Sequence, residues 1–461
     1  MEKEIFIKRS PINAPADAVF RWHARPGAFE RLIPPWDPLR IIRRQGGIQP
    51  GATAVLKMNA APFSFRWIAE HTDYEENRLF RDQQKKGPFA LWIHTHRFEP
   101  DGTDACHLED HIEYALPFHP LGNMVGASVI RKKLERIFDY RHRITALDMA
   151  DHLSIKDQKP LNILISGAGG LIGSGLVPFL TAGGHQVTRL VRRPAASEKN
   201  EVCWDPASGH LNPDDIEGTD TVIHLSGENI GTGRWTEGKR KKIIESRTKS
   251  TRLIAETMTK LSPMPRVLVC ASAIGWYGNR GNTVLTEKDV PGNDFISHVC
   301  EEWEKAAVPA VEKGIRVVFM RIGVVLTPAG GALGKVLPLF KLGIGGKAGT
   351  GSQYMSWIGT DDVIGAVYHV ISDDRIHGPV NTVSPNPVTN LEYTETLGRV
   401  LSRPTLLPVP AAAIKLAFGR MGREILLSGA RVMPDRLLET GYRFRNPDLE
   451  GALRHLLGKK H

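Results

Sequence analysis

The chain has 461 residues, which is too long for one ordinary hydrophobic core, so we expect two or three domains. Its hydrophobic content of 41% is typical of a globular protein, and no apolar run reaches the ~18 to 20 residues that a membrane helix needs. The net charge is +10, but the basic residues are spread along the chain and their densest runs contain no interleaved aromatic residues. This pattern disfavours nucleic-acid binding.

The cysteines and the N-terminus bear on the cellular compartment. Cys106, Cys203, Cys270 and Cys300 are widely spaced and form no C-x-x-C pair, which predicts free thiols in a reducing compartment and argues against a zinc site. The opening MEKEIFIKRS lacks the apolar segment of a secretory signal. We therefore expect a cytoplasmic protein.

Residues 1–150 are expected to form strands followed by one long helix. EIFIKRSPI begins as a strand, and DAVFRWHARPGAFERLI is typical of short helices bounded by prolines. Alternating runs follow, namely TAVLKMN, FSFRWIAEH, ALWIHTHRFE and ACHLEDHIEYAL. Residues 124–150 then place apolar side chains at helical spacing. The pattern predicts a curved antiparallel sheet that grips one amphipathic helix.

This order of elements, together with the turn GGIQPGAT, resembles the SRPBCC or START-like helix-grip fold. The resemblance implies an α+β domain over residues 1–150 with an apolar cavity for a small lipophilic ligand. The same residues would equally well fill an ordinary core, and both alternatives stay open.

Four histidines of this region raise the question of a metal. His94 and His96 share one face of a predicted strand, and His107 and His111 share a face of the next. No cysteine or carboxylate pattern at ligand spacing accompanies them. We interpret all four as exposed polar positions of the sheet and predict no metal site.

A glycine-rich segment follows a polar stretch over 151–160 that we interpret as a linker. From residue 162, NILISGAGGLIGSGLVPFLTAGGHQVTRLVRR predicts a strand, a turn, a helix and a second strand. Gly167, Gly170 and Gly173 are spaced G-x-x-G-x-x-G, so a pyrophosphate can approach backbone N–H groups at the start of the helix. This arrangement predicts a dinucleotide site.

The end of the second strand selects the cofactor. Arg192 and Arg193 stand where an acid would bind the free ribose hydroxyl of NAD, and no acid occurs before Glu198. Two guanidinium groups favour the 2′-phosphate of NADP(H). The alternative is a pair of solvated arginines.

The alternation of strands and helices continues to about residue 323. TVIHLSG (221–227), RVLVCAS (266–272) and RVVFMRIG (316–323) predict buried strands, with helices over about 236–260 and 295–313. This is the pattern of an α/β doubly wound parallel sheet. Ligands of such sheets lie beyond the carboxyl ends of the strands, where we expect Leu225, Ser226, Gly227 and Ser272.

The motifs SGAGGLIG, DTVIHLSGENI, SRTKST, SAIGWYG, RIGVVL and SWIGTDD resemble the extended short-chain dehydrogenase/reductases, and more narrowly their YfcH-type NAD(P)-dependent epimerase-like subfamily. The resemblance covers residues 161–461. It implies a Rossmann domain over 161–395 that binds NADP(H), and a substrate-side segment over 396–461. The resemblance implies that the phosphate turn is formed by Gly167, Gly170, Leu171, Ile172 and Gly173. It further implies that Arg192 binds the adenosine phosphate and that Leu225 and Ser226 flank the cofactor. Arg247 would make a further phosphate contact.

The catalytic residues of that superfamily are only partly present. Its members use a Ser, a Tyr and a Lys four residues after the Tyr, and Ser272 fits the first role. When the later helix is aligned by Glu304, Ile296 and Cys300 occupy the Tyr and Lys positions, and none of the eight tyrosines has Lys at +4. The candidates to replace the missing Tyr as proton donor are Tyr277, Glu228 and Cys300.

Two functions follow from this pattern. The first is an NADP(H)-dependent oxidoreductase or epimerase that acts on a small carbonyl or nucleotide-sugar-type substrate with an atypical acid. The second is a catalytically silent NADP(H) sensor whose N-terminal domain binds a lipophilic ligand. In both, the partners are small molecules, with no nucleic acid and no membrane span.

Overall fold

A computed structural model describes residues 3–37, 39–60, 63–117, 121–154, 159–196 and 199–460. The chain folds into two compact units, one formed mainly by residues up to Gln158 and the other mainly by residues from Lys159 onward. Of the expected linker, residues 155–158 lie outside the described residues, as does Glu198. Among the described helices, none combines the length and apolar character needed to cross a membrane.

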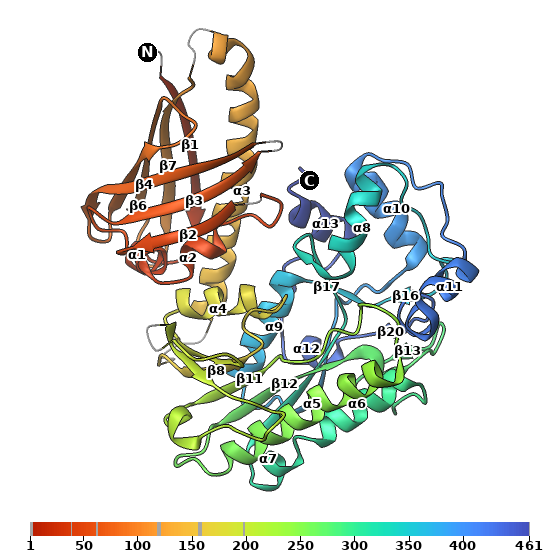
Figure 1. Cartoon of the computed structure of the whole chain (residues 1–461). Coiled ribbons are helices and arrows are strands. Elements are labelled where there is room, and N and C mark those ends of the chain that lie inside the picture. The colour runs from red at the N-terminus through yellow and green to blue at the C-terminus, as the bar shows by residue number, and fades with distance from the viewer. Residues whose placement is uncertain are drawn as a thin grey trace. The chain divides into compact units, whose positions relative to one another are not determined.

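The N-terminal unit is a seven-stranded antiparallel sheet in the order β1-β7-β6-β5-β4-β3-β2. Figure 1 shows the long helix α3 running along this sheet. The strands are β1 (Glu4–Ile12), β2 (Leu39–Gln45), β3 (Thr53–Ala60), β4 (Phe63–Glu75), β5 (Leu79–Lys86), β6 (Leu91–Pro100) and β7 (Cys106–Ala115), and the helices are α1 (Ala16–Ala24), α2 (Ala28–Arg31) and α3 (Leu121–Leu153). The predicted helix-grip arrangement is confirmed.

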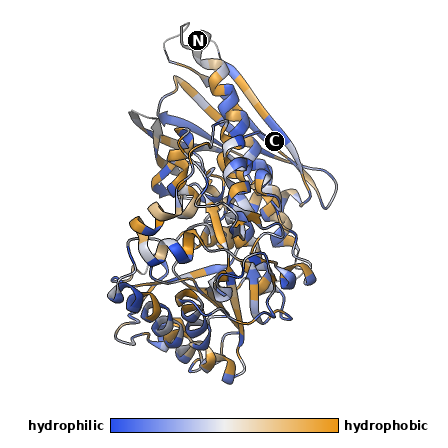
Figure 2. Ribbon diagram, turned by 90° about the vertical axis from the view of Figure 1, so that its right-hand side faces the viewer, coloured by the Kyte–Doolittle hydropathy of each residue, from blue (hydrophilic) through white to orange (hydrophobic). Residues whose placement is uncertain are grey.

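Strand β7 shows how the alternating sequence builds this unit. Its residues from Cys106 to Tyr114 alternate between buried and partly exposed positions, so every second side chain faces the inside of the sheet. One of the buried side chains is a carboxylate, Asp110. Hydrophobic and hydrophilic residues also alternate along α3 (Figure 2). The inner face therefore combines apolar packing with a buried charge.

The C-terminal unit is a seven-stranded parallel sheet in the order β10-β9-β8-β11-β12-β14-β18. The strands are β8 (Asn162–Ser166), β9 (Gln186–Val191), β10 (Glu201–Cys203), β11 (Thr221–His224), β12 (Val267–Ala273), β14 (Arg316–Ile322) and β18 (Gly378–Thr382). The chain reverses its direction of winding between β8 and β11, which is the point where ligands of such sheets bind. The predicted doubly wound sheet is confirmed.

Helices cover both faces of this sheet. Helices α5 (Glu237–Met258), α6 (Phe295–Lys305) and α7 (Val308–Glu312) lie on one face, and α9 (Thr360–Ser372) lies on the other (Figure 1). Helix α4 (Gly173–Ala182) begins at the glycine turn, and its Gly175 packs closely against Ile364 of α9. Because both faces are covered, the sheet strands are nearly continuous hydrophobic runs.

The remaining elements are short. They are the helices η2 (Pro213–Ile216), η3 (Ile274–Tyr277), α8 (Gly331–Lys341), α10 (Asn390–Leu401), α11 (Ala411–Met421), η4 (Gly422–Leu426), α12 (Asp435–Glu439) and α13 (Leu449–Leu457), and the strands β13 (Val284–Leu285), β15 (Val324–Thr327), β16 (Tyr354–Met355), β17 (Trp357–Gly359), β19 (Val388–Thr389) and β20 (Arg431–Val432).

Candidate functional site

The glycine turn lies between β8 and α4, at the reversal point of the parallel sheet. Gly167 has a φ of 77°, and a Cβ there would lie 2.8 Å from the carbonyl carbon of Leu225. A Cβ on Gly173 would lie 2.3 Å from the carbonyl oxygen of Gly167. Side chains are therefore excluded at both positions by backbone. The turn folds tightly against the residues that follow β11, and α4 begins at its last glycine.

This turn has free hydrogen-bond donors. The amide of Gly170 donates to the carbonyl of Gly167, but among the described residues no acceptor binds the amides of Leu171 and Ile172. Unpaired amides at a helix start carry partial positive charge and attract phosphate. The five residues predicted for the phosphate turn thus lie together and offer the groups that a pyrophosphate needs.

Arg247 of α5 lies beside the segment that follows β11. Its guanidinium lies 4.8 Å from the centroid of the Trp303 ring, and Nη1 donates to the carbonyl of Ile243 at 3.1 Å. A Cβ on Gly227 would lie 3.2 Å from the guanidinium carbon. No described carboxylate pairs with Arg247, and burial lowers its pKa. An arginine on a helix is ordinarily solvated, whereas this one is a buried cation without a counter-ion.

The two arginines after β9 differ in their partners. Both are exposed, but Nη2 of Arg193 donates to Oε1 of Glu201 at 2.8 Å. Glu201 belongs to β10, the neighbouring strand, which the sequence interpretation did not consider. Among the described residues no acid pairs with Arg192. Of the two, Arg192 is the guanidinium available to a phosphate.

Ser272 lies near the carboxyl end of β12, in a buried polar network. Its hydroxyl donates to Oε1 of Glu304 at 2.7 Å. Arg321 donates to the same carboxylate through Nε at 2.9 Å and through Nη2 at 3.0 Å. The one proton of the Ser272 hydroxyl is therefore directed to Glu304.

Tyr277 ends η3 and belongs to the same network. Its side chain is fully buried, and its hydroxyl donates to Oδ1 of Asn381 at 2.7 Å and accepts from Nη1 of Arg321 at 3.1 Å. Burial raises the pKa of Tyr277 to about 12. Both partners of its hydroxyl are buried protein groups, and the role of Tyr277 towards a substrate stays a prediction.

Ile296 and Cys300 line the inner face of α6, beside the segment that follows Ser272. A Cβ on Gly275 would lie 2.2 Å from Cγ2 of Ile296, and Sγ of Cys300 lies 3.7 Å from the carbonyl oxygen of Ala273. Burial raises the pKa of Cys300 to about 12, so its thiol is a poor proton donor at neutral pH.

Glu228, the remaining substitute, follows the turn after β11 and is paired with Lys239. Its hydrogen bond with Lys239 lowers the pKa of the carboxyl, which favours the ionised form. Its side chain keeps 39% of its surface exposed, so the burial that an acid role would need is absent. Glu228 is therefore held as a carboxylate by Lys239 and is poorly suited to donate a proton.

The N-terminal unit contains a cavity of about 190 Å³. Apolar side chains form most of its lining, among them Leu56, Trp67 and Phe138, and a polar end is formed by Asp82, His94, His96 and Arg141. Of the two alternatives for this unit, the structure therefore favours a cavity over a filled core.

The expectation that the four histidines are exposed is wrong for two of them. His94 and His96 are only 5% and 9% exposed, whereas His107 and His111 lie on the outer face and are partly exposed. The reason is that β6 turns His94 and His96 to the inner face, where Asp82 and Asp110 of the flanking strands accompany them.

Three family matches cover most of the chain. Residues 12–138 match the polyketide cyclase/dehydrase and lipid transport family, and residues 163–382 match the NAD dependent epimerase/dehydratase family. Residues 409–456 match a domain of unknown function.

Curated relatives match somewhat less than two thirds of the chain. The chain is 41% identical over 292 residues to the epimerase family protein Mb2239 of Mycobacterium bovis, which covers 63% of this chain and 96% of that relative. It is 36% identical over 302 residues to the human epimerase family protein SDR39U1, covering 64% of this chain and 100% of the relative.

Two solved structures are also similar. A structure described as the nucleoside-diphosphate sugar epimerase from Corynebacterium glutamicum superimposes with a TM-score of 0.81 at 31% identity, covering 98% of this chain and 90% of that one. Human SDR39U1 with NADPH has a TM-score of 0.60 at 34% identity, covering 64% and 99%. By these matches the chain belongs to the NAD(P)-dependent epimerase family, in which it carries an additional N-terminal domain of the polyketide cyclase type.

Proposed function

We propose that the C-terminal unit binds NADP(H) at the glycine turn and that the chain is an NADP(H)-dependent oxidoreductase or epimerase. Its substrate is a small carbonyl or nucleotide-sugar-type compound. The observation that carries the proposal is the turn from Gly167 to Gly173. Its backbone excludes a side chain at these two glycines, and among the described residues no acceptor binds the amides of Leu171 and Ile172 at the start of α4.

The surrounding residues fit this cofactor. Arg192 meets the 2′-phosphate, Leu225 and Ser226 flank the cofactor, and the buried guanidinium of Arg247 compensates a phosphate charge. A relative with 34% identity has been solved with NADPH, which supports NADP(H) over NAD(H). When bound, the nicotinamide supplies or accepts a hydride.

The proton for such a reaction must come from a group other than the usual Tyr and Lys. Ile296 and Cys300 occupy those positions, and Ser272 and Tyr277 are held in the network of Glu304 and Arg321. In this proposal Ser272 and Tyr277 form the floor of the site. Glu228 and Lys239 form an ionisable pair next to Leu225 and Ser226, the residues that flank the cofactor.

The cofactor assignment is tested by exchanging the charge at Arg192. We expect NADPH to bind at least about tenfold more tightly than NADH, and Arg192→Asp to reverse this preference, because an acid repels the 2′-phosphate and binds the free hydroxyl. Titrations of both cofactors by fluorescence measure the two dissociation constants. Arg193→Ala is the matched control and should leave the preference intact. Equal affinities of the unaltered chain for both cofactors would refute the assignment.

The second candidate function is an NADP(H) sensor without catalysis. It is favoured by one observation, the buried network that binds the hydroxyls of both Ser272 and Tyr277. A screen of NADPH oxidation over aldehydes, ketones and nucleotide sugars, run beside Ser272→Ala, separates the two functions. Turnover of any of these substrates supports the enzyme, and turnover that Ser272→Ala leaves unchanged removes Ser272 from the mechanism. Cofactor binding without turnover on any substrate supports the sensor.

A further inference from the structure

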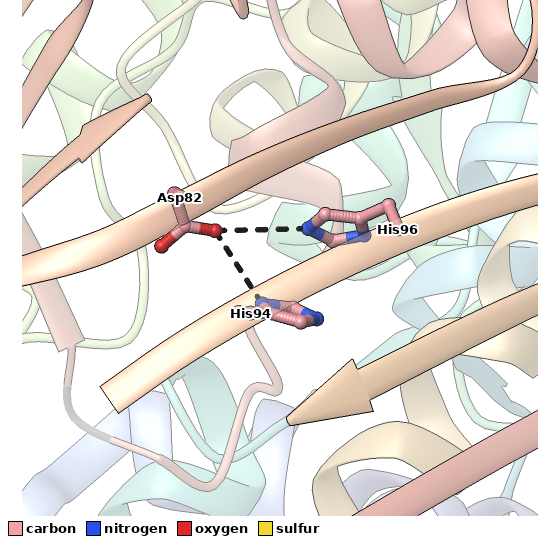
Figure 3. Close-up of side chains that lie close together, drawn as sticks. All are labelled: Asp82, His94 and His96. Carbon is pink, nitrogen blue, oxygen red and sulfur yellow. Dashed lines mark ion pairs between the residues drawn. The ribbon is translucent and has the colours of Figure 1, made fainter. Parts of the chain in front are cut away.

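Two neighbouring strands bring a carboxylate and two imidazoles together at the polar end of the N-terminal cavity, and a third strand adds a second carboxylate beside the imidazoles. In the antiparallel register, Asp82 of β5 stands opposite His94 of β6. On the other side of β6, Asp110 of β7 stands opposite His96. Since His94 and His96 are two residues apart on one strand, both rings face the same side. Figure 3 shows one oxygen of Asp82 facing a nitrogen of each ring.

The distances suit an ion between the three side chains better than direct hydrogen bonds. Oδ2 of Asp82 lies 3.5 Å from Nδ1 of His94 and 3.9 Å from Nε2 of His96. The three ligand atoms all lie within 4.8 Å of one another. Bonds of about 2.0 to 2.2 Å to one metal ion place its ligands roughly 3 to 3.5 Å apart, so the ligand atoms must move closer together when an ion binds. Among the described residues no group donates a hydrogen bond to Asp82.

Asp110 holds both rings from the opposite side. Its Oδ1 lies 2.7 Å from Nε2 of His94 and 2.6 Å from Nδ1 of His96, and its Oδ2 lies 2.7 Å from Nε2 of His142. Metal-binding histidines ordinarily have their second nitrogen held by a carboxylate in this way. The hydrogen bond between Nε2 of His94 and Asp110 turns Nδ1 of the same ring towards Asp82. Two imidazoles and a carboxylate that converge in this way form a site for a cation.

We propose that Asp82, His94 and His96 bind one divalent transition-metal ion in the N-terminal unit. Two imidazole nitrogens and one carboxylate oxygen favour zinc, iron or cobalt over magnesium or calcium. All three side chains line the cavity, so the coordination positions that the protein leaves open face it. Those positions accept water or an oxygen atom of a molecule in the cavity.

The test uses the full chain, freed of metal with a chelator and titrated with Co²⁺ and then Zn²⁺. We expect one Co²⁺ per chain with visible ligand-field absorption, displaced by one Zn²⁺, and a thermal midpoint that rises with metal concentration. Asp82→Asn should weaken Zn²⁺ binding by about a hundredfold or more, since it removes a ligand. Asp110→Asn should weaken binding roughly 10- to 100-fold through ring orientation.

The outer-face histidines supply the matched control. His107→Ala and His111→Ala remove imidazoles from the same sheet and should leave Co²⁺ binding unchanged. The thermal midpoint of metal-free Asp82→Asn shows whether that nearly isosteric variant is folded, and His96→Ala provides a second ligand deletion. The proposal is overturned if the folded chain gives no ligand-field absorption, or if the Zn²⁺ affinity is the same in Asp82→Asn, His96→Ala and the unaltered chain.

Discussion

Tyr277 and Tyr393 are both buried phenols, but their hydroxyls have different surroundings. The Tyr277 hydroxyl binds Asn381 and Arg321, whereas the Tyr393 hydroxyl has no hydrogen-bond partner among the described residues. We expect Tyr277→Phe to lower the free energy of unfolding by about 1 to 3 kcal/mol, because it leaves two buried polar groups without a partner. Tyr393→Phe should be neutral or slightly stabilising, since it removes an unsatisfied hydroxyl.

Thermal and urea unfolding of the two variants measure this difference. If Tyr277 only supports the floor of the site, Tyr277→Phe should also bind NADPH as tightly as the unaltered chain. Equal stability of the two variants would contradict the hydrogen-bonding role of Tyr277. Loss of turnover without loss of stability would return Tyr277 to the catalytic residues.

Single residues were predictable where the backbone itself demands them. Gly167 and Gly173 could be assigned from spacing because only glycine fits their close backbone contacts. The pairing of Arg193 with Glu201, and of His94 with Asp82, could not, because each depends on which strands become neighbours. An acid directly across a hairpin from a His-x-His strand is the signal that would have revealed the latter cluster.

At the scale of elements, β11 depends on a histidine that must stay neutral. His224 ends this strand fully buried, with Nδ1 2.6 Å from Oγ of Ser166 on β8 and Nε2 3.0 Å from Oγ of Ser250 on α5. Burial lowers the pKa of His224 to about 3. The unfolded chain, with a histidine pKa of about 6.5, therefore binds this proton more readily than the folded one.

The free energy of unfolding should fall as the pH falls from about 6.5, the pKa of an unfolded histidine, towards the lower pKa of His224 in the folded chain. Above pH ~6.5 the neutral His224 does not reduce the free energy of unfolding. The reduction grows as the pH falls towards 3 and is on the order of 2 kcal/mol at pH 5. We expect His224→Asn to be less stable at pH 7 but to lose less stability between pH 7 and pH 5. Urea midpoints at both pH values check this, with the exposed His298→Asn as control. An unchanged pH dependence in His224→Asn would exclude His224 as its source.

Elements were predictable where burial is uniform. Strands β12 and β14 are largely buried and mostly apolar, and both were expected. The helices α5 and α6 were expected as well. Strands β2 (LRIIRRQ) and β5 (LFRDQQKK) were not expected, because their charged residues hide the alternation. They belong to the sheet because neighbouring strands supply their hydrogen bonds, and that information is not local in the sequence.

At the scale of the whole molecule, two different families are joined in one chain. The helix-grip and doubly wound parts each resemble known folds, so the fold class was predictable from element order. The division at residues 151–160 stays a prediction. The human relative is matched over 100% of its length by 64% of this chain, which indicates that the epimerase part exists elsewhere without the N-terminal domain.

We therefore expect residues 159–461 to fold alone and to bind NADPH as tightly as the full chain does. The proposed cofactor contacts all lie in this part, from Gly167 to Arg247, whereas Asp82, His94 and His96 lie outside it. Circular dichroism, an NADPH titration and a Co²⁺ titration of this fragment check the expectation. The fragment should keep the NADPH affinity and lack the single tight Co²⁺ site. A fragment that is unfolded, or binds NADPH more than about tenfold more weakly, would show that the cofactor site depends on the N-terminal unit.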